Sequence, residues 1–193
     1  MALRLTKQQA LLAALVAVFA VVWYFREQLG VIVADYAGEY WPLPDVGKPY
    51  ADTIKAASVE EGVPFDLLAR ELWQESRFNP SAVNSGSGAT GIAQFMPATA
   101  AQLGIDPLDP SQAIPAMAGY LTTIQDYIES KTSVAATWAM ALAGYNWGMG
   151  NVVKALNTYG DQWLANAPTE TRAYVGGILS DVPLEPLPAG AIT

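Results

Sequence analysis

Glu75 is the carboxylate whose sequence context best suits proton transfer. Apolar spacing predicts a helix over residues 65–77, and Leu68, Leu72 and Glu75 share its apolar stripe. Burial among apolar side chains and the negative end of the helix dipole both disfavour an ionised carboxylate in this last turn. We therefore expect the Glu75 pKa to lie above its ordinary value of about 4.3, so that the acid keeps its proton near neutral pH. Glu71, one turn earlier, could be a partner, but a surface position is the commoner outcome for a helical glutamate.

A second carboxylate, Glu170, begins a predicted helix directly after Pro168 and Thr169. Free backbone N–H groups and the positive end of the helix dipole stabilise an acid there, so Glu170 should stay ionised. A protonated Glu75 and an ionised Glu170 would be two carboxyl groups with separated pKa values, an arrangement that suits the cleavage of glycosidic bonds. Acids that only stabilise the start of a helix are common at this position. Spacing alone does not show that the two glutamates meet.

The composition removes several other kinds of chemistry. The 193 residues include no His and no Cys, so imidazole bases, thiol nucleophiles, zinc-thiolate sites and disulfides are excluded. Acid and base catalysis must then use carboxylates, Lys or Tyr. No metal site and no cofactor are expected. The net charge of -8 argues against a nucleic-acid partner, and the 52% apolar content excludes disorder.

Residues 86–91 fit the glycine pattern G-x-G-x-x-G of dinucleotide-binding proteins. That fingerprint requires a buried strand before it and a ribose-binding acid about 20 residues later. The preceding segment is hydrophilic and broken by Pro80, and no second strand follows. We reject a nucleotide site and expect a loop whose glycines allow a close backbone approach.

Residues 145–150, which read Tyr-Asn-Trp-Gly-Met-Gly, form a candidate binding edge. They place rings and polar tips at a helix end closed by glycines, a location typical of binding sites. Most other aromatic side chains are expected in the core.

The elements that must position these residues are helices almost throughout. Strict alternation is nowhere long enough to predict a strand, so the fold class is mainly α. Expected caps are Asp109, Ser133 and Thr169, and expected stops are Gly104 and Gly160. The predicted helices cover residues 51–61, 65–77, 97–103, 110–129, 134–146, 151–158 and 170–180.

An apolar segment at residues 8–25 predicts one transmembrane helix ahead of this domain. Its 18 uncharged residues would extend roughly 27 Å as a helix, close to the hydrocarbon thickness of a bilayer. Trp23 and Tyr24 suit the membrane boundary, and no small-x-small cleavage site follows, so we expect an uncleaved anchor rather than a signal peptide. Basic residues before the segment place the N-terminus in the cytoplasm and the rest outside it.

The chain accordingly divides into four predicted parts. Residues 1–27 are the cytoplasmic tip and anchor, and the proline-rich residues 28–49 are a juxtamembrane stalk. Residues 50–184 form the helical domain, and residues 185–193 are a proline-rich tail.

Four segments together resemble the signature blocks of the family 1 soluble-type lytic transglycosylases. They occur in the family's order between about residues 50 and 180. They read Glu-Ser-Arg-Phe-Asn-Pro-Ser-Ala at 75–82, Gly-Ile-Ala-Gln-Phe-Met-Pro-Ala-Thr-Ala at 91–100, Ala-Leu-Ala-Gly-Tyr-Asn at 141–146 and Glu-Thr-Arg-Ala-Tyr-Val at 170–175. The resemblance implies a lysozyme-like helical fold.

The resemblance also implies roles for individual residues. Glu75 matches the family's single catalytic acid and base, and Glu170 matches a second glutamate that supports the site. The positions matched to substrate binding are Ser76, Gln94, Met96, Tyr145, Asn146, Glu170 and Tyr174. The chain departs from the family pattern, which usually has Met at the position of Ala93 and a small residue and Pro at those of Trp147 and Met149. These departures bear on groove shape and preferred glycan length.

The implied reaction is cleavage of the β-1,4 bond between N-acetylmuramic acid and N-acetylglucosamine in peptidoglycan, with closure of a 1,6-anhydro ring. Two alternatives stay open: a hydrolytic goose-type muramidase, and a non-catalytic wall-binding component of a secretion or virus assembly. The expected setting is a single-pass membrane protein with its catalytic domain periplasmic or otherwise extracytoplasmic, with a virion membrane as the alternative. The expected partners are peptidoglycan glycan strands, the membrane through residues 8–25 and, in the assembly case, a larger envelope or virion complex.

Overall fold

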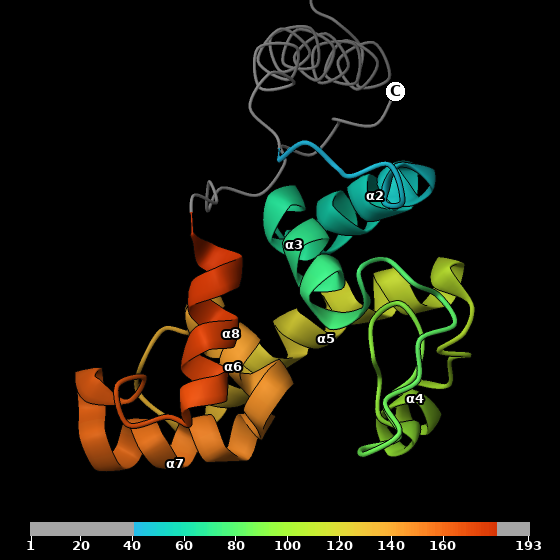
Figure 1. The fold of residues 1–193 in the computed structure, drawn as a ribbon. Helices are drawn as coiled ribbons and strands as arrows, with labels where there is room; N and C mark the ends of the chain where they lie inside the picture. The colour runs from blue at the N-terminus through green and yellow to red at the C-terminus, as the bar shows by residue number, and fades with distance from the viewer. Residues whose placement is uncertain (1–40, 181–193) are drawn as a thin grey trace, which may run out of the picture. The chain divides into compact units, whose positions relative to one another are not determined.

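The computed structural model describes residues 41–180, and these residues are mainly helical (Figure 1). Extended pairing within this range is limited to isolated bridges of Thr90 with Val83 and with Phe95. The predicted mainly α class is therefore confirmed. The helices are α2 (Ala51–Glu61), α3 (Phe65–Ser76), α4 (Pro97–Leu103), α5 (Pro110–Lys131), α6 (Trp138–Ala143), α7 (Met149–Tyr159) and α8 (Thr169–Leu179), with short turns η1 (Lys48–Tyr50), η2 (Gly144–Gly148) and η3 (Gly160–Gln162).

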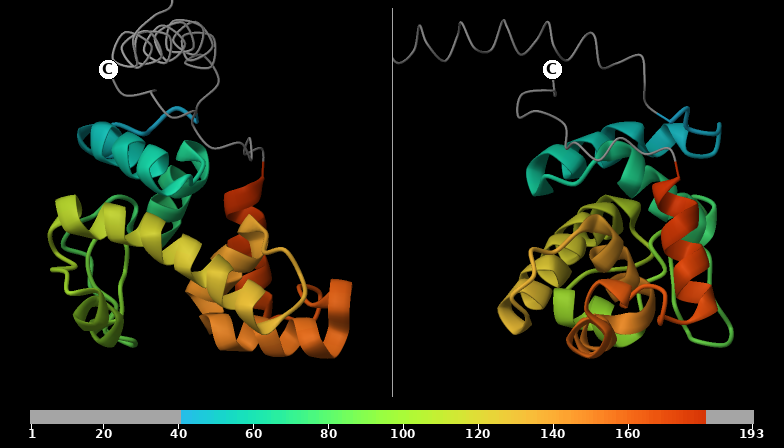
Figure 2. Two further views of the ribbon diagram at one scale, coloured as in Figure 1. Left: turned by 180° about the vertical axis from the view of Figure 1, so that it is seen from behind. Right: turned by 90° about the vertical axis from the view of Figure 1, so that its left-hand side faces the viewer.

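The long helix α5 packs against α2, α6, α7 and η2. Viewed from behind, it crosses between the loop that carries α4 and the group formed by α6, α7 and α8 (Figure 2). The Asp109 side chain accepts a hydrogen bond from the Ser111 N–H (2.9 Å), which confirms the predicted cap. The buried residues of α5 recur at helical spacing and are Ala113, Ile114, Met117, Ala118, Leu121, Ile124 and Ile128.

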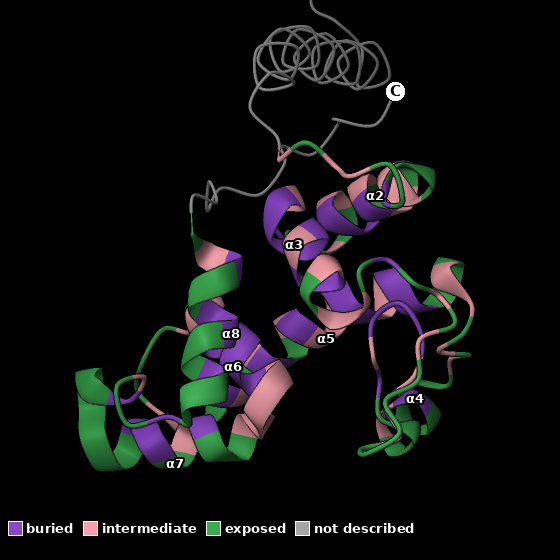
Figure 3. Ribbon diagram, viewed as in Figure 1, coloured by how far each residue is buried: buried purple, intermediate pink, exposed green. Residues whose placement is uncertain are grey.

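Helix α3 presents its apolar face to α2 and α8, and buried residues gather on these facing surfaces (Figure 3). The helix ends at Ser76, one residue before the predicted end, because Arg77 adopts a left-handed conformation with φ of 57°. Phe78 follows with φ of 60°, so the chain leaves α3 at once. Glu75 consequently lies in the last helical turn, beside the loop formed by residues 77–96.

The prediction of one helix over residues 134–146 was wrong. Helix α6 begins only at Trp138, where Thr137 rather than Ser133 provides the cap and accepts from the Met140 N–H. Val134 is 42% exposed, so a first turn at this point would bury little apolar surface. After Ala143 the helix changes to the π-helical turn η2, a feature often found at functional sites.

Helix α8 begins one residue earlier than predicted. Thr169 is its first helical residue, not its cap, and the Thr169 hydroxyl accepts a hydrogen bond from the Arg172 guanidinium (3.0 Å). Thr171, Tyr174, Val175 and Ile178 are buried, so this face of α8 packs inward, against α3 and α6.

The segment before α2 is attached to α3. The Trp41 N–H donates to a carboxylate oxygen of Asp66 (2.9 Å), and the Trp41 ring lies edge-on to that of Trp73 with centroids 6.3 Å apart. The Arg70 guanidinium stands 5.5 Å from the centre of the Trp41 ring. Trp41 is thus held by three residues of one helix.

No helix within residues 41–180 combines the length and apolar content needed to cross a bilayer. The predicted anchor at residues 8–25 and the predicted tail at 185–193 lie outside the described residues.

Candidate active site

Glu75 lies partly buried in the last turn of α3, where one of its carboxyl oxygens is bound by a tyrosine from α8. The Tyr174 hydroxyl donates to Glu75 Oε1 over 2.6 Å. Burial raises the pKa of Glu75 to about 7, although the Tyr174 hydrogen bond acts in the opposite direction. The direction of the shift agrees with the prediction from the apolar stripe. At neutral pH the group can therefore both donate and accept a proton.

Tyr174 reaches this position because it lies on the inward face of α8, in contact with α3. Its ring and hydroxyl are buried, and burial, together with the two neighbouring carboxyl groups of Glu71 and Glu75, raises its pKa well above the usual range. Tyr174 is therefore a neutral hydrogen-bond donor throughout the ordinary pH range.

The surface position predicted for Glu71 was wrong. The residue is 0% exposed, and its Oε1 lies 3.1 Å from the Tyr174 hydroxyl. Burial, followed by repulsion from the Glu75 charge, raises the pKa of Glu71 well above its usual range. A signal was present in the sequence, because Glu71 precedes Glu75 by four residues and follows Leu68 by three, spacings that share a helix face.

Tyr145 in η2 faces the same carboxyl groups. Its hydroxyl donates to the Ala93 carbonyl (2.7 Å), and its ring packs against Phe95 and Tyr120 at centroid distances of 5.8 and 5.7 Å. Burial raises the pKa of Tyr145 well above its usual range, and the charge of Glu75 adds to the effect. The π-helical turn thereby brings a second tyrosine into the electrostatic environment of Glu75.

Two residues that the sequence predicted for substrate binding, Ser76 and Gln94, make hydrogen bonds to the loop of residues 77–96. Ser76 donates through its hydroxyl to the Ile92 carbonyl (2.7 Å). The Gln94 side-chain amide donates to the Gly91 carbonyl (2.8 Å) and the Ala82 carbonyl (3.2 Å), while its own backbone has φ of 51°. The Ser76 bond holds the loop beside the last turn of α3, where Glu75 lies, and the Gln94 bonds join two parts of the loop to each other.

The close backbone approach predicted for the glycine loop occurs within the protein, between Gly91 and Pro107. Gly91 has φ of +82°, and a Cβ there would lie 1.7 Å from the Pro107 carbonyl oxygen. Only glycine fits that contact. The nucleotide site that we rejected has no strand before it, since α3 and its terminal turn precede the loop.

The remaining predicted site residues, Asn146, Met96 and Glu170, make no hydrogen bond to Glu75 within residues 41–180, and they differ in their exposure to solvent. Asn146 accepts at Oδ1 from the Thr171 hydroxyl (2.8 Å), which joins η2 to α8. Met96 is 44% exposed at the start of α4. Glu170 is exposed in the first turn of α8, and its side chain makes no hydrogen bond or ion pair within residues 41–180.

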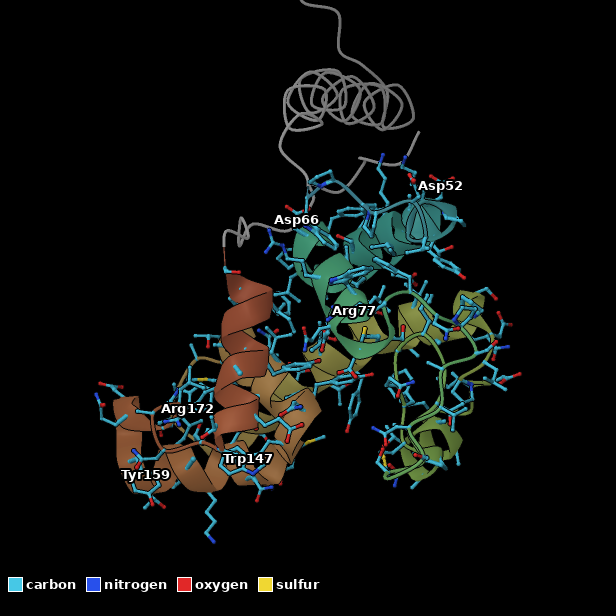
Figure 4. The ribbon with its side chains drawn as sticks, viewed as in Figure 1. Asp52, Asp66, Arg77, Trp147, Tyr159 and Arg172 are labelled. Atoms are coloured by element: carbon cyan, nitrogen blue, oxygen red, sulfur yellow. The ribbon has the colours of Figure 1, made fainter. Side chains whose placement is uncertain are left out.

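Two further residues, Arg77 and Trp147, lie near the ends of helices. Figure 4 shows Arg77 at the end of α3 and Trp147 near the start of α7. The Arg77 guanidinium stands 4.6 Å from the centre of the Trp73 ring. Trp147 is partly buried and its carbonyl accepts from the Asn151 amide (2.7 Å).

Within the described residues, no group of three or more acidic, His or Cys side chains is arranged to hold a metal ion.

Comparison with known proteins finds transglycosylases. The family described as "Transglycosylase SLT domain" matches residues 52–166. The membrane-bound lytic murein transglycosylase F of Alcanivorax borkumensis is 39% identical over 107 residues, which are 55% of this chain and 23% of that protein. The corresponding protein of Maricaulis maris is 37% identical over 108 residues, again 55% and 23% of the two chains.

A phage protein is also similar. The peptidoglycan transglycosylase gp16 of Escherichia phage T7 is 32% identical over 152 residues, which are 74% of this chain and 11% of that protein. The aligned region thus spans about a quarter or less of each of these relatives. The family match covers more than half of the chain, and we conclude that this protein belongs to the transglycosylase SLT domain family.

Proposed function

We propose that this protein is a lytic transglycosylase with a lysozyme-like helical fold. In this proposal it cleaves the β-1,4 bond between N-acetylmuramic acid and N-acetylglucosamine in peptidoglycan and leaves 1,6-anhydromuramic ends. The observation that carries the proposal is the pair formed by Glu75 and Tyr174, in which a partly buried carboxyl with a pKa of about 7 receives a 2.6 Å hydrogen bond. The names of the relatives support the substrate class.

Glu75 performs both proton transfers in the proposed reaction. As the bond between muramic C1 and the glycosidic oxygen breaks, the Glu75 carboxylic acid protonates that oxygen, which leaves as the hydroxyl of N-acetylglucosamine. The Glu75 carboxylate then removes the proton of the muramic C6 hydroxyl while that oxygen bonds to C1. The carboxylic acid is regenerated, no water is consumed, and one group serves as acid and then as base.

Glu71, which shares the Tyr174 hydroxyl with Glu75, is unsuited to act as a second catalytic carboxylate. Glu71 is completely buried and shares the Tyr174 hydroxyl, so it cannot touch a sugar. A hydrolase of the usual two-carboxylate type needs its second carboxylate at the sugar, either as a nucleophile or as a base for water. In the proposed reaction the nucleophile is the C6 hydroxyl of the substrate itself, so no second carboxylate is needed at the sugar.

The other predicted site residues receive roles that follow from their surroundings. Ser76 keeps the loop of residues 77–96 beside Glu75, Gln94 stabilises that loop from within, and Asn146 keeps η2 beside α8. Met96 and Glu170 are exposed and are proposed to contact the glycan directly. Tyr145 is proposed to lie near the scissile bond.

We further propose that residues 8–25 anchor the protein in a membrane, with the N-terminus in the cytoplasm and residues 50–184 on the side where peptidoglycan lies. Recruitment to a larger envelope or virion assembly is part of the same proposal. The names of the relatives, which include membrane-bound enzymes and a phage transglycosylase, support this location.

Product analysis tests the proposed reaction. The full chain is purified in detergent and incubated with purified sacculi, and the released muropeptides are identified by mass spectrometry. Anhydromuramic ends are the expected product, whereas reducing muramic ends would establish the hydrolytic muramidase instead. Binding to sacculi with no release would establish the non-catalytic alternative. The Glu75→Gln variant is the matched control, because it keeps the shape of the side chain and removes the transferable proton.

A further inference from the structure

Glu71 is a fully buried carboxyl group to which the proposed reaction gives no task. It lies one helical turn before Glu75 on the inward face of α3. Its Oε1 is 3.1 Å from the Tyr174 hydroxyl, and its Oε2 has no hydrogen-bond partner among residues 41–180. A buried carboxylate without compensating hydrogen bonds is costly, so its presence here requires an explanation.

The positions of the three side chains decide how their protons are arranged. The Tyr174 hydroxyl has one proton and two carboxyl neighbours, at 2.6 Å for Glu75 and 3.1 Å for Glu71. The shorter distance assigns this proton to Glu75. The Tyr174 oxygen then faces Glu71 as an acceptor, and the contact is favourable only if Glu71 supplies a proton.

A neutral Glu71 satisfies these requirements. With its proton on Oε1 it donates to the Tyr174 oxygen, and Oε2 becomes a carbonyl-type oxygen. An unpartnered neutral oxygen costs less than an unpartnered buried charge. The chain of donors then runs in one direction, from Glu71 to Tyr174 to Glu75, and each bond polarises the next.

The surrounding groups favour the same protonation state. The titratable side chains that face Glu71 are Glu75 of α3, Tyr174 of α8 and Tyr145 of η2, and Tyr120 of α5 lies beside Tyr145. Each of these groups is neutral or, when ionised, negative. When Glu75 loses its proton during the reaction, its charge holds the proton on Glu71 more firmly.

We propose that Glu71 is a positioning residue that stays protonated throughout the catalytic cycle and directs the Tyr174 hydroxyl toward Glu75. This inference rests on the proposed function of Glu75 as acid and base. Its consequence for the reaction is stabilisation of the Glu75 carboxylate in the interval between the two proton transfers. Glu71 acts through Tyr174 and does not touch the substrate.

Two substitutions separate this role from the alternatives. Glu71→Gln keeps a neutral polar group that can donate to the Tyr174 oxygen, whereas Glu71→Leu removes both donor and acceptor. The full chain in detergent, labelled with ¹³C at the glutamate carboxyl carbons, is titrated by NMR, and the Glu75 signal is assigned by its loss in Glu75→Gln. The rate of muropeptide release is measured over the same pH range. Glu60→Gln, an exposed change of equal charge on α2, is the control.

We expect Glu71→Gln to leave the Glu75 pKa within about 0.3 pH units, and the rate within about twofold, of the values for the unsubstituted protein. We expect Glu71→Leu to raise the Glu75 pKa by about one pH unit and to reduce the rate by roughly tenfold, as for the loss of one hydrogen bond to a charged group. A purely structural role would not move the Glu75 pKa selectively.

Opposite results overturn the proposal. If Glu71 were ionised, Glu71→Gln would remove a negative charge and lower the Glu75 pKa by about one pH unit or more. If Glu71 were a bystander, folded Glu71→Leu would titrate and react like the unsubstituted protein. Should the leucine variant fail to fold, Glu71→Met provides the same comparison. The titration requires no substrate, so it judges Glu71 even if the protein releases no muropeptides and the proposed function fails.

Discussion

The hydroxyl of Tyr174 lies 2.6 Å from Oε1 of Glu75, although the two residues are 99 positions apart in the chain. The contact joins the last turn of α3 to the second turn of α8, between a buried tyrosine and a partly buried carboxyl group. Through this hydrogen bond, Tyr174 of α8 lowers the pKa of Glu75. Burial raises the Glu75 pKa, and the packing of α8 against α3 supplies the hydrogen bond that opposes this rise.

Tyr174→Phe should raise the Glu75 pKa above about 7. The Tyr174 hydrogen bond lowers the Glu75 pKa, so its loss leaves burial unopposed. A hydrogen bond to a charged group contributes about 1.5 to 3 kcal/mol, which corresponds to an upward change of about one to two pH units. The alkaline limit of activity should move upward by the same amount while the maximal rate falls. A pH–rate profile on sacculi checks this, and an unchanged limit would contradict it. Tyr127→Phe, a partly buried tyrosine on α5, is the control.

Stability should fall as the pH rises between about 4.5 and 7. The pKa of Glu75 is about 7 in the folded protein against an ordinary value of 4.5, so the folded state binds this proton more tightly than the unfolded chain. The contribution is fully present below pH 4.5, is lost as the pH rises through 7, and amounts to less than about 3 kcal/mol. Buried Glu71 acts in the same direction.

Glu75→Gln should therefore weaken, but not abolish, this pH dependence. Thermal unfolding of the full chain in detergent at pH 5, 6, 7 and 8 measures the difference. The exposed change Glu60→Gln should leave the dependence as it is. Equal pH dependence in the Glu75→Gln variant and the unsubstituted protein would show that Glu75 does not titrate abnormally.

Glu170→Gln should reduce activity much less than Glu75→Gln. The Glu170 side chain is exposed and makes no hydrogen bond within residues 41–180, so its replacement should leave stability within about 0.5 kcal/mol. A supporting contact to the glycan should be worth roughly tenfold in rate, against about 100-fold to 10,000-fold for the acid and base itself. Equal losses in both variants, with reducing ends among the products, would instead identify Glu170 as the base of a hydrolase.

Gly91→Ala should destabilise the protein by more than about 2 kcal/mol. The added Cβ would lie 1.7 Å from the Pro107 carbonyl oxygen, and backbone atoms cannot give way as a flexible side chain can. Gly62→Ala is the matched control, because Gly62 also has positive φ, at +67°, but has no atom within 4 Å of the added carbon. That change should cost about 1 kcal/mol from the backbone conformation alone. Thermal unfolding compares the two, and equal losses would contradict the role of the Pro107 contact.

Local signals in the sequence predicted most of the helices. Asp109 before Pro110 marked the start of α5, and Gly104 marked the end of α4, because caps and stops act within a few residues. The region of residues 134–148 was predicted poorly. Its π-helical turn depends on Gly144 lying against Ile124, where a Cβ would come within 2.4 Å, and that contact comes from a different helix.

For the candidate site, the amino-acid sequence by itself determined that Glu75 lies on the apolar stripe of its helix and that its pKa is raised, since periodicity and burial follow from the order of residues in one helix. Helical spacing also put Glu71 on the face of Glu75, but only the tertiary structure decided that this position is fully covered and that Tyr174 is the residue that binds both carboxyl groups. The physical reason is that a helix carries its pattern in its own sequence, whereas the neighbour that covers each face is selected by packing between segments about 100 residues apart.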